Sequence, residues 1–260
     1  YRAKAKGGGT AVYSPGQDLY NVRRLELLGD LRDAVRSDDL VVHYQPVIDL
    51  RDDRVSGFEA LMRWEHPERG LLAPAEFMEV AEETGLIVPL GRHVFAEACQ
   101  QTVAWQQGPA SGDLGVYVNF SAAQLRHEAV VQDVAVVLDD TGIDPACVQV
   151  EVTEHVLLDE EDVAVSQIAA LKDLGVKTPS VLTIHNVAHQ GVFPKDALTT
   201  LGLTREDFTV AGIEFYGSVN LLKQGIISAD TVTTVSPTYA KEIQTAEQGH
   251  RLDGVLRAKG

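Results

Sequence analysis

The feature that most restricts the fold of this chain is an alternation of strand-like and helix-like segments over its first two thirds. In some runs apolar and polar residues alternate, and between them apolar residues recur every three or four positions, as on one side of a helix. The expected strands are 40–47, 55–61, 115–121 and 147–153, and the expected helices are 22–35, 74–84, 89–107, 128–138 and 160–174. Alternating segments of this length are typical of parallel strands joined by helical crossovers. We therefore predict an α/β fold.

The first two expected strands are an exception, because only a short turn at Asp52 and Asp53 separates them. Parallel neighbours need a long crossover, whereas a short turn joins antiparallel strands. The first strand is therefore expected to run antiparallel to the second.

Charge is distributed unevenly along the chain. Residues 1–177 contain 30 acidic and 15 basic residues, whereas residues 178–260 contain 8 acidic and 7 basic ones. A change at one point suggests two segments of different origin. The net charge of -16 argues against DNA as a partner, because nucleic-acid binding depends on basic surface.

The sequence does not support a membrane-spanning protein, a disulfide-rich protein or a cysteine-based zinc site. No apolar run is long enough to cross a membrane, and no apolar stretch follows the basic residues near the N-terminus, so a cytoplasmic location is expected. Two cysteines, Cys99 and Cys147, are too few for a disulfide framework or a zinc set, and they are expected to be small buried apolar residues.

The pattern continues beyond Lys177 with fewer elements. Strands are expected at 180–184 and 231–235, and helices are expected near 218–227 and from Pro237 onward. The stretch between the first of these strands and the first of these helices is rich in turn residues and is expected to be a loop.

Three polar side chains stand where expected strands end, namely Glu59, Asn119 and Glu151. At the carboxyl ends of neighbouring parallel strands such residues converge on one face, and their oxygen atoms suit Mg²⁺ or Mn²⁺. A carboxylate near a strand end is also typical of a solvated edge or an ion pair. Residue type and spacing alone leave both interpretations open.

Several motifs occur together in the order and spacing of EAL-family cyclic-di-GMP phosphodiesterases. They are Tyr-Gln-Pro-Val-Ile-Asp-Leu at 44–50, Glu-Ala-Leu-Met-Arg-Trp at 59–64, Pro-Ala-Glu-Phe at 74–77, Ala-Glu-Glu-Thr-Gly-Leu-Ile at 81–87, Val-Asn-Phe-Ser at 118–121 and Glu-Val-Thr-Glu at 151–154. The resemblance implies a partial EAL-type (β/α) barrel with an antiparallel first strand. It also implies hydrolysis of cyclic di-GMP to linear pGpG, and it leaves a homodimer open.

The resemblance assigns roles to individual residues. It implies that Glu59, Asn119 and Glu151 bind Mg²⁺ or Mn²⁺, with Glu59 also catalytic. Gln45 and Arg63 match residues that hold the cyclic dinucleotide, Arg63 through a charge-assisted contact to phosphate. A further match, Glu154, supports the loop that follows the next strand.

The same likeness sets domain limits. Residues 1–16 resemble the C-terminal tail of a GGDEF diguanylate-cyclase domain, a frequent upstream neighbour, and residues 17–177 resemble a truncated EAL domain. The helix at 22–35 would then link the two.

The EAL pattern stops at Lys177. The family would next supply an Asp-Asp motif that completes the metal site, and later a lysine, a glutamate and a glutamine, none of which is present. Phosphodiesterase activity is therefore expected to be very weak or absent, because both water activation and charge neutralisation are reduced. A non-catalytic cyclic-di-GMP binder that keeps Gln45 and Arg63 is the alternative.

Residues 178–260 resemble a different family, the bacterial glycogen (starch) synthases. The motifs are Thr-Ile-His-Asn-Val-Ala-His-Gln-Gly at 183–191, Gly-Ile-Glu-Phe-Tyr-Gly at 212–217, Asn-Leu-Leu-Lys at 220–223 and Thr-Thr-Val-Ser-Pro-Thr-Tyr-Ala-Lys-Glu-Ile at 233–243. The resemblance implies a fragment of a Rossmann-like N-terminal lobe, with ADP-glucose as donor and His185 as a catalytic residue near the donor sugar. The family's N-terminal Lys-Thr-Gly-Gly loop and its C-terminal lobe are missing.

The junction suggests one structural hypothesis. Residues 180–184 could pair beside 147–153 as a substitute fifth strand, which would direct His185 toward the place where an aspartate is expected. Histidine can bind divalent metals but is neutral, so it would not restore the lost negative charge.

Overall fold

The computed structural model describes residues 15–37, 39–108, 114–153 and 161–259. The chain divides into two compact units, unit 1 (residues 1–178) and unit 2 (residues 179–260). Most of the expected GGDEF tail (residues 1–16) lies outside the described residues. None of the described helices is both long enough and apolar enough to cross a membrane.

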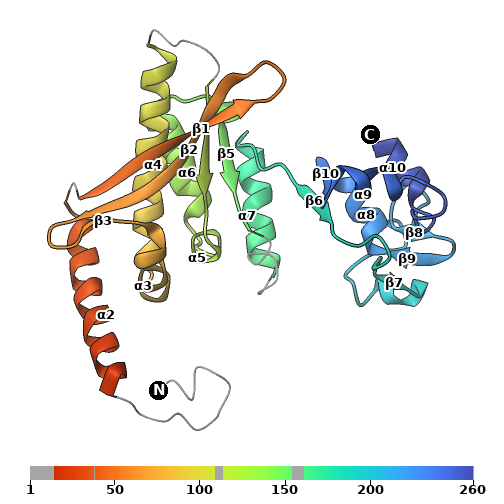
Figure 1. The fold of residues 1–260 in the computed structure, drawn as a ribbon, viewed down its shortest axis with the longest axis horizontal. Helices are drawn as coiled ribbons and strands as arrows, with labels where there is room; N and C mark the ends of the chain where they lie inside the picture. The colour runs from red at the N-terminus through yellow and green to blue at the C-terminus, as the bar shows by residue number, and fades with distance from the viewer. Residues whose placement is uncertain (1–14, 38, 109–113, 154–160, 260) are drawn as a thin grey trace. The chain divides into compact units, whose positions relative to one another are not determined.

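Unit 1 is built on one mixed sheet (Figure 1). Its strands are β1 (Leu40–Asp49), β2 (Arg54–His66), β3 (Gly70–Leu72), β4 (Gly115–Asn119) and β5 (Val148–Glu151). The order is β1-β2-β4-β5, with β3 added at the distal end of β2. β1 is antiparallel to β2, whereas β2, β4 and β5 are parallel. The predicted partial barrel with an antiparallel first strand is confirmed.

Five of the described helices of unit 1 overlap the expected ones, and the short helix at Ala122–Leu125 was not expected. They are α2 (Pro15–Ala34), α3 (Met78–Thr84), α4 (Ile87–Gln106), α5 (Ala122–Leu125), α6 (Val130–Thr141) and α7 (Glu161–Asp173). The helix expected at 74–84 is divided, because a 3-10 turn at Pro74–Glu76 precedes α3. Left-handed glycines end α3 and α6, with φ of 75° at Gly85 and 67° at Gly142.

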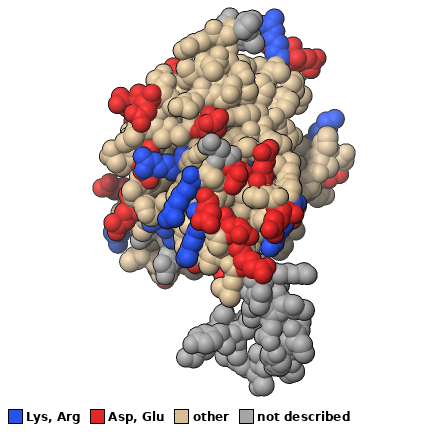
Figure 2. Space-filling model, turned by 90° about the vertical axis from the view of Figure 1, so that its left-hand side faces the viewer, with Lys and Arg blue, Asp and Glu red and all other residues tan. Residues whose placement is uncertain are grey.

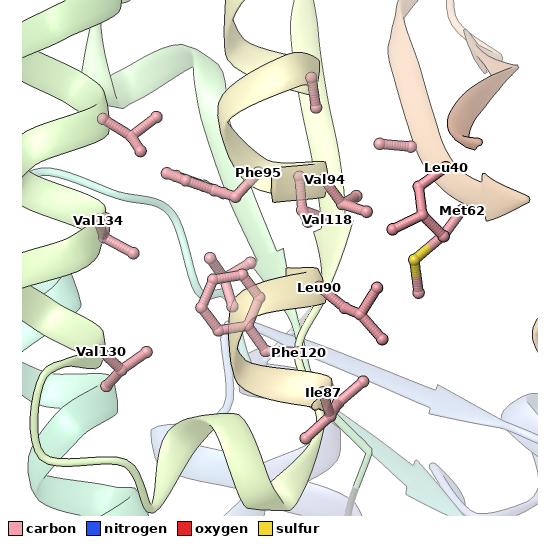
Figure 3. Packing of buried hydrophobic residues seen from close by; sticks show 14 of the residues in the cluster. Leu40, Met62, Ile87, Leu90, Val94, Phe95, Val118, Phe120, Val130 and Val134 are labelled. Atoms are coloured by element: carbon pink, nitrogen blue, oxygen red, sulfur yellow. The ribbon is translucent and has the colours of Figure 1, made fainter. Parts of the chain in front are cut away.

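The core of unit 1 lies between the sheet and α4, α6 and α7 (Figure 3). On the parallel strands, alternate side chains are buried on this side: Ala60, Met62, Val116, Val118, Val148 and Val150. From α4, Leu90 and Phe95 pack against them, and Phe95 makes an edge-to-face contact with Phe120, with ring centroids 5.8 Å apart. The residues between these positions face the other side of the sheet, so the period of two decides which side chains are free for a site.

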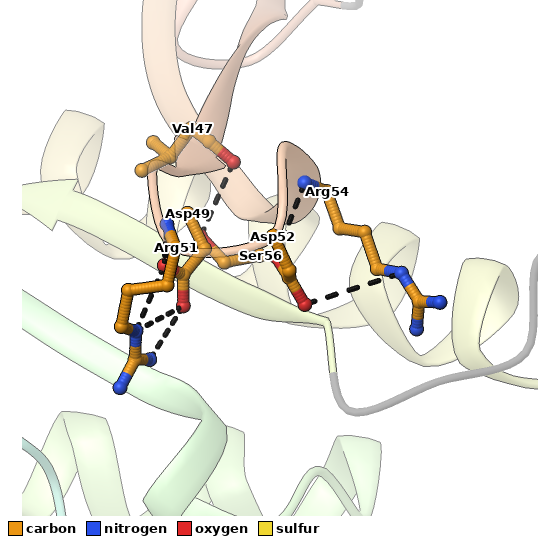
Figure 4. A network of polar contacts seen from close by, with 6 residues as sticks. All are labelled: Val47, Asp49, Arg51, Asp52, Arg54 and Ser56. Carbon is orange, nitrogen blue, oxygen red and sulfur yellow. Dashed lines mark hydrogen bonds and ion pairs between the residues drawn. The ribbon is translucent and has the colours of Figure 1, made fainter.

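The β1–β2 hairpin ends in a polar turn (Figure 4). The guanidinium of Arg51 donates to both carboxylate oxygens of Asp49, and Ser56 Oγ donates to the carbonyl of Val47 across the hairpin at 3.2 Å. These bonds satisfy polar groups where the sheet ladder ends.

The outer edge of β5 is occupied by one residue of the same unit. The N–H of Lys177 donates to the Val148 carbonyl at 2.8 Å, and the N–H of Val150 donates to the Lys177 carbonyl at 2.9 Å. Pro179 follows almost at once and has no N–H with which to extend such a ladder. The pairing therefore stops after a single bridge.

The predicted substitute strand is wrong. Strand β6 (Val181–Ile184) pairs in parallel with β10 (Thr231–Thr234) inside unit 2, and it is not part of the sheet that contains β5. The sequence of β6 fits any parallel neighbour, and the partner it finds lies about fifty residues later in the same unit. His185 is therefore not placed by β6 beside β5.

Unit 2 combines this strand pair with a second small sheet. β7 (Val192–Phe193), β9 (Ser218–Asn220) and β8 (Glu214–Phe215) form an antiparallel sheet in that order. The sequence predicted a loop over most of this region, because strands of two or three residues are too short to show a period. The helices of unit 2 are α8 (Leu221–Ser228), α9 (Pro237–Glu242) and α10 (Asp253–Lys259).

Buried polar groups organise unit 2. The Lys223 side chain is only 5% exposed, and its Nζ donates to the carbonyls of Val210 and Glu214, both at 2.6 Å. The buried Asn220 amide donates to Gln190 Oε1 at 2.7 Å. The Lys223 bonds fasten the loop before β8 and the start of β8 to α8, and the Asn220 bond joins the end of β9 to the segment before β7. The apolar clusters of this unit are small.

Acidic side chains outnumber basic ones on the face of the molecule in Figure 2, and the two kinds are interspersed. The absence of DNA as a partner stays a prediction from the net charge.

Candidate functional site

The predicted site residues of unit 1 lie on the sheet face opposite the helices. Along β2, Ala60 and Met62 are buried beneath the helices, so Glu59, Leu61 and Arg63 face the other way. On β4 and β5 the same alternation directs Asn119 and Glu151 to this second face. Asn119 and Glu151 are the last residues of β4 and β5. Glu59 was expected at a strand end but lies within β2, which continues to His66, near the end of its parallel pairing with β4.

Two of these side chains are in direct contact. Asn119 Nδ2 donates to Glu59 Oε1 at 2.7 Å, across the β2–β4 pair. Asn119 is also the register partner of Glu151 in the β4–β5 pair. The amide on β4 therefore lies between a carboxylate on β2 and a carboxylate on β5.

The electrostatics of Glu151 show that the carboxylates are close. Burial raises the pKa of Glu151, and the negative charge of Glu59 raises it further. A side-chain hydrogen bond with Gln149 lowers the pKa and offsets part of this effect. A carboxylate whose ionisation is opposed by a neighbouring negative charge lies where a cation is favoured.

Gln45 and Arg63 occupy the same face at different distances from the carboxylates. Gln45 is exposed and is the register partner of Glu59 in the β1–β2 pair, so these two side chains are neighbours. Arg63 lies four residues farther along β2 and is half-buried, and its Nη1 donates to the Met62 carbonyl at 2.7 Å. Among the described residues, no group accepts a hydrogen bond from its other guanidinium nitrogens.

Two predicted residues are not brought to this site. Glu154 lies outside the described residues. His185 directly follows β6 in unit 2 and is exposed. Its expected approach to the EAL-type site required pairing of β6 with β5, which does not occur.

One residue of the site was missed from the sequence. Gln149 stands two positions before Glu151 on β5 and so shares its face, and it forms the side-chain hydrogen bond that lowers the pKa of Glu151. The signal was the period of two in Val148-Gln149-Val150-Glu151, which places both polar residues on one side.

The side-chain oxygen atoms of Glu59, Asn119 and Glu151 are suitable ligands for a hard divalent cation, but they are few. Among the described residues, no three His, Cys, Asp or Glu side chains are grouped so that they could hold a metal ion. Glu59 and Glu151 become a set of three oxygen donors only when the Asn119 amide oxygen is included. Mg²⁺ takes six ligands in near-octahedral geometry, so water and substrate would have to supply the rest.

Comparison with known proteins decides the family of unit 1. The EAL domain family matches residues 28–178, which is more than half of the chain. The chain belongs to the EAL domain family.

Curated relatives extend this match across bacteria. The chain is 37% identical over 177 residues to MucR of Pseudomonas aeruginosa, a bifunctional diguanylate cyclase/cyclic di-GMP phosphodiesterase, covering 68% of this chain and 26% of that protein. It is 38% identical over 178 residues to the cyclic di-GMP phosphodiesterase PdeR of Escherichia coli, covering 68% of this chain and 26% of that protein. The chain thus spans about a quarter of the length of these EAL relatives.

Solved structures agree on the fold. A structure of the PaMucR phosphodiesterase in a c-di-GMP complex has a TM-score of 0.55 and 37% identity, and covers 61% of this chain and 63% of that one. The EAL enzyme Bd1971 in its cAMP- and cyclic-di-GMP-bound form has a TM-score of 0.59, covers 92% of this chain and 57% of that one, and at 16% identity shows the fold alone.

The second part of the chain matches a different family. The starch synthase catalytic domain family matches residues 163–258. Glycogen synthase of Thermodesulfovibrio yellowstonii is 55% identical over 83 residues, which cover 32% of this chain and 17% of that protein. The resemblance of residues 178–260 to glycogen synthases is therefore supported, for a small share of such a protein.

Proposed function

We propose that unit 1 binds cyclic di-GMP and hydrolyses it, with divalent-cation dependence, to the linear dinucleotide at a strongly reduced rate. The observation that carries the proposal is the Asn119–Glu59 contact of 2.7 Å beside Glu151, on the sheet face opposite the helices. Relatives that share this domain are cyclic di-GMP phosphodiesterases, and one of them is solved as a c-di-GMP complex.

The residues divide the work between cation and substrate. Glu59, Asn119 and Glu151 would hold Mg²⁺ or Mn²⁺, which when bound supplies water activation and neutralises charge on the phosphodiester. Rotation of the Asn119 amide would exchange its nitrogen, which now donates to Glu59, for its oxygen. Gln45 and Arg63 would hold the dinucleotide, and Glu154 would support a neighbouring loop.

The reduced rate follows from the lack of further acidic ligands on the sheet after β5. Past Lys177 no acidic strand end is added to the sheet among the described residues, because β6 belongs to unit 2. A single set of three oxygen donors cannot form the paired metal site that clamps the attacking and leaving oxygens of a phosphodiester, and loss of such charge stabilisation costs several kcal/mol of barrier.

The test is incubation of the full chain with cyclic di-GMP and Mn²⁺ or Mg²⁺, followed by chromatographic separation of the products. The expected result is slow formation of pGpG that stops on addition of EDTA, and that is at least about a thousandfold slower than with an intact EAL domain such as that of MucR. Saturable binding with no product would identify a non-catalytic binder. Absence of both binding and product would refute the proposal.

Three further features complete the proposal. We include the GGDEF-domain tail at residues 1–16, a homodimer, and a cytoplasmic location. Sedimentation analysis of the chain with and without cyclic di-GMP checks the homodimer.

Unit 2 supports a second candidate function, that of a glycogen synthase fragment that uses ADP-glucose. Its 55% identity to a glycogen synthase favours this reading, with His185 near the donor sugar. Incubation with ADP-glucose and a glycogen primer tests it. Transfer of glucose that is lost in His185→Ala would support it, and no transfer would leave unit 2 without this activity.

A further inference from the structure

The chain passes from the end of β4 directly into the cap of α5. Asn119 is the last residue of β4, and Ser121 is the N-cap of α5. Between them, the N–H of Phe120 donates to the carbonyl of Glu151 at 2.8 Å, which ties this link to β5. Because only Phe120 separates Asn119 from the cap, the position of the cap influences where the Asn119 amide lies.

The cap of α5 is closed by the side chain of Gln124. The N–H of Ser121 donates to Gln124 Oε1 at 3.0 Å, and the N–H of Gln124 donates to Ser121 Oγ at 3.3 Å. This reciprocal pair is a capping box. Since α5 has only four residues, its own helical bonds are few, and the capping box has a large share in fixing its first turn.

Gln124 is buried against a glycine of α4. Its side chain belongs to a residue that is only 6% exposed, and it occupies the space beside Gly91. A Cβ atom added to Gly91 would collide with Gln124 Nε2 and would lie 2.6 Å from Cδ. Among the described residues, no group accepts a hydrogen bond from Nε2. The amide is therefore placed by the Ser121 N–H and by the lack of a side chain at Gly91.

We infer that Gln124, seated against Gly91, is a positioning residue for the cation site of unit 1. It acts through the cap at Ser121, which holds the end of β4 and with it the Asn119 amide. This inference rests on the proposed function. A cation site needs its ligands held within about 0.5 Å of their working geometry, and Mg²⁺ is especially demanding. A displaced cap therefore weakens ion binding although it touches no ligand.

Gly91→Ala separates positioning from stability. Gly91 lies inside α4, where alanine is the better helix former, so the helix itself gains from the substitution. The added methyl group nevertheless displaces the Gln124 amide. Electron paramagnetic resonance titration of the full chain with Mn²⁺ should show at least about tenfold weaker binding. Gly29→Ala is the matched control, because Gly29 lies on α2 with nothing within 4 Å of an added Cβ atom, and it should bind Mn²⁺ like the unmodified chain.

A second pair of variants changes the acceptor itself. Gln124→Met keeps the length of the side chain but loses the acceptor for the Ser121 N–H, and it should also weaken Mn²⁺ binding at least about tenfold. Gln124→Glu keeps an oxygen at the same place, as many capping boxes do, and should restore most of the affinity. Phe95 and Val134 line the same small cavity as Gln124, so a packing role alone would favour Met over Glu. The order of the two variants therefore distinguishes positioning from packing.

The Asn119 side-chain amide gives a readout that needs no ion. Its NMR signals in the ion-free chain, assigned by their loss in Asn119→Leu, should shift in Gly91→Ala and in Gln124→Met, and should stay in place in Gly29→Ala. Unmoved signals in the first two variants would overturn the inference, as would equal Mn²⁺ affinity in Gly91→Ala and Gly29→Ala. If the unmodified chain binds no Mn²⁺, the proposed function fails, and the amide signals still decide the inference. The Gln124 pair decides it where Gly91→Ala does not fold.

Discussion

The two units place polar residues at strand ends in the same way, but only one of them gathers these residues into a site. In unit 1, three neighbouring parallel strands bring Glu59, Asn119 and Glu151 together. In unit 2, the parallel sheet has two strands, and His185 stands exposed after β6. A strand end therefore becomes a candidate site only when adjacent strands of the same sheet supply its partners.

The interiors of the units differ in a related way. Unit 1 has one continuous apolar core between sheet and helices, whereas unit 2 has two small apolar clusters linked by buried hydrogen bonds. A sheet of several strands can bury a full face against helices, but a strand pair cannot. Substitutions that separate these two kinds of stabilisation test the comparison.

The largest expected effect is on the core of unit 1. Phe95→Ala should lower its free energy of unfolding by about 3–5 kcal/mol, because it removes a ring that packs against Phe120 and leaves a cavity. Urea denaturation followed by hydrogen exchange with mass spectrometry reports each unit separately. Leu50→Ala is the control, since Leu50 is 88% exposed. Equal loss in both units would contradict two separate cores.

A smaller loss of stability is expected when a buried polar residue of unit 2 is replaced. Lys223→Met should destabilise this unit by about 1–3 kcal/mol, because the carbonyls of Val210 and Glu214 lose their donor. Hydrogen exchange with mass spectrometry again measures the stability of unit 2. Lys241→Met is the control, and it should change this stability little because Lys241 is exposed. Unaltered protection of the loop before β8 in the first variant would show that the buried amine does not hold it.

The candidate cation site should respond to the loss of one charge. Glu59→Gln should weaken Mn²⁺ binding about tenfold or more, because one anionic ligand is removed while the Asn119 amide keeps an acceptor. Electron paramagnetic resonance titration measures the free ion. Glu65→Gln serves as the control, six residues away on the same face of β2. Equal affinity in both variants would place the ion elsewhere.

The smallest expected effect concerns the β1–β2 turn. Hydrogen bonds from Arg51 hold the pKa of Asp49 down to about 2. Because the pKa of Asp49 is lowered in the folded protein, the ion pair stabilises the fold at pH values above the usual aspartate range. This stabilisation is lost as the pH falls toward 2. In Arg51→Gln the Asp49 midpoint, followed by NMR, should return toward about 3.9. Arg54→Gln should leave the Asp49 midpoint unchanged. A midpoint that does not move in Arg51→Gln would show that Arg51 is not the cause of the lowered pKa.

The sequence predicted most of unit 1 because its elements are long enough to show a period. The antiparallel first pair followed from the short turn at Asp52 and Asp53, and the face shared by Glu59 and Arg63 followed from alternation. Gln149 was overlooked because a single polar residue within a four-residue strand resembles an exposed edge.

Pairing partners were harder to predict than elements. The strand at 181–184 was expected correctly, but its pattern is the same beside any parallel neighbour, and only the structure shows β10 in that place. Strands β7, β8 and β9 have two or three residues each, which is too short for an alternating pattern to predict them. The 3-10 turn at Pro74–Glu76 depends on a local bond from the Ala73 N–H to Glu76, which helical periodicity does not encode.

The most direct test of the central claim is calorimetric titration of cyclic di-GMP into the full chain with and without Mn²⁺. The claim is that Glu59, Asn119 and Glu151, on three parallel strands of unit 1, form one cation site that recruits the dinucleotide. Binding should require the ion and should be weakened at least about tenfold in Asn119→Leu, while His185→Ala binds like the unmodified chain. Binding that ignores Mn²⁺ and Asn119, or no binding at all, would contradict it.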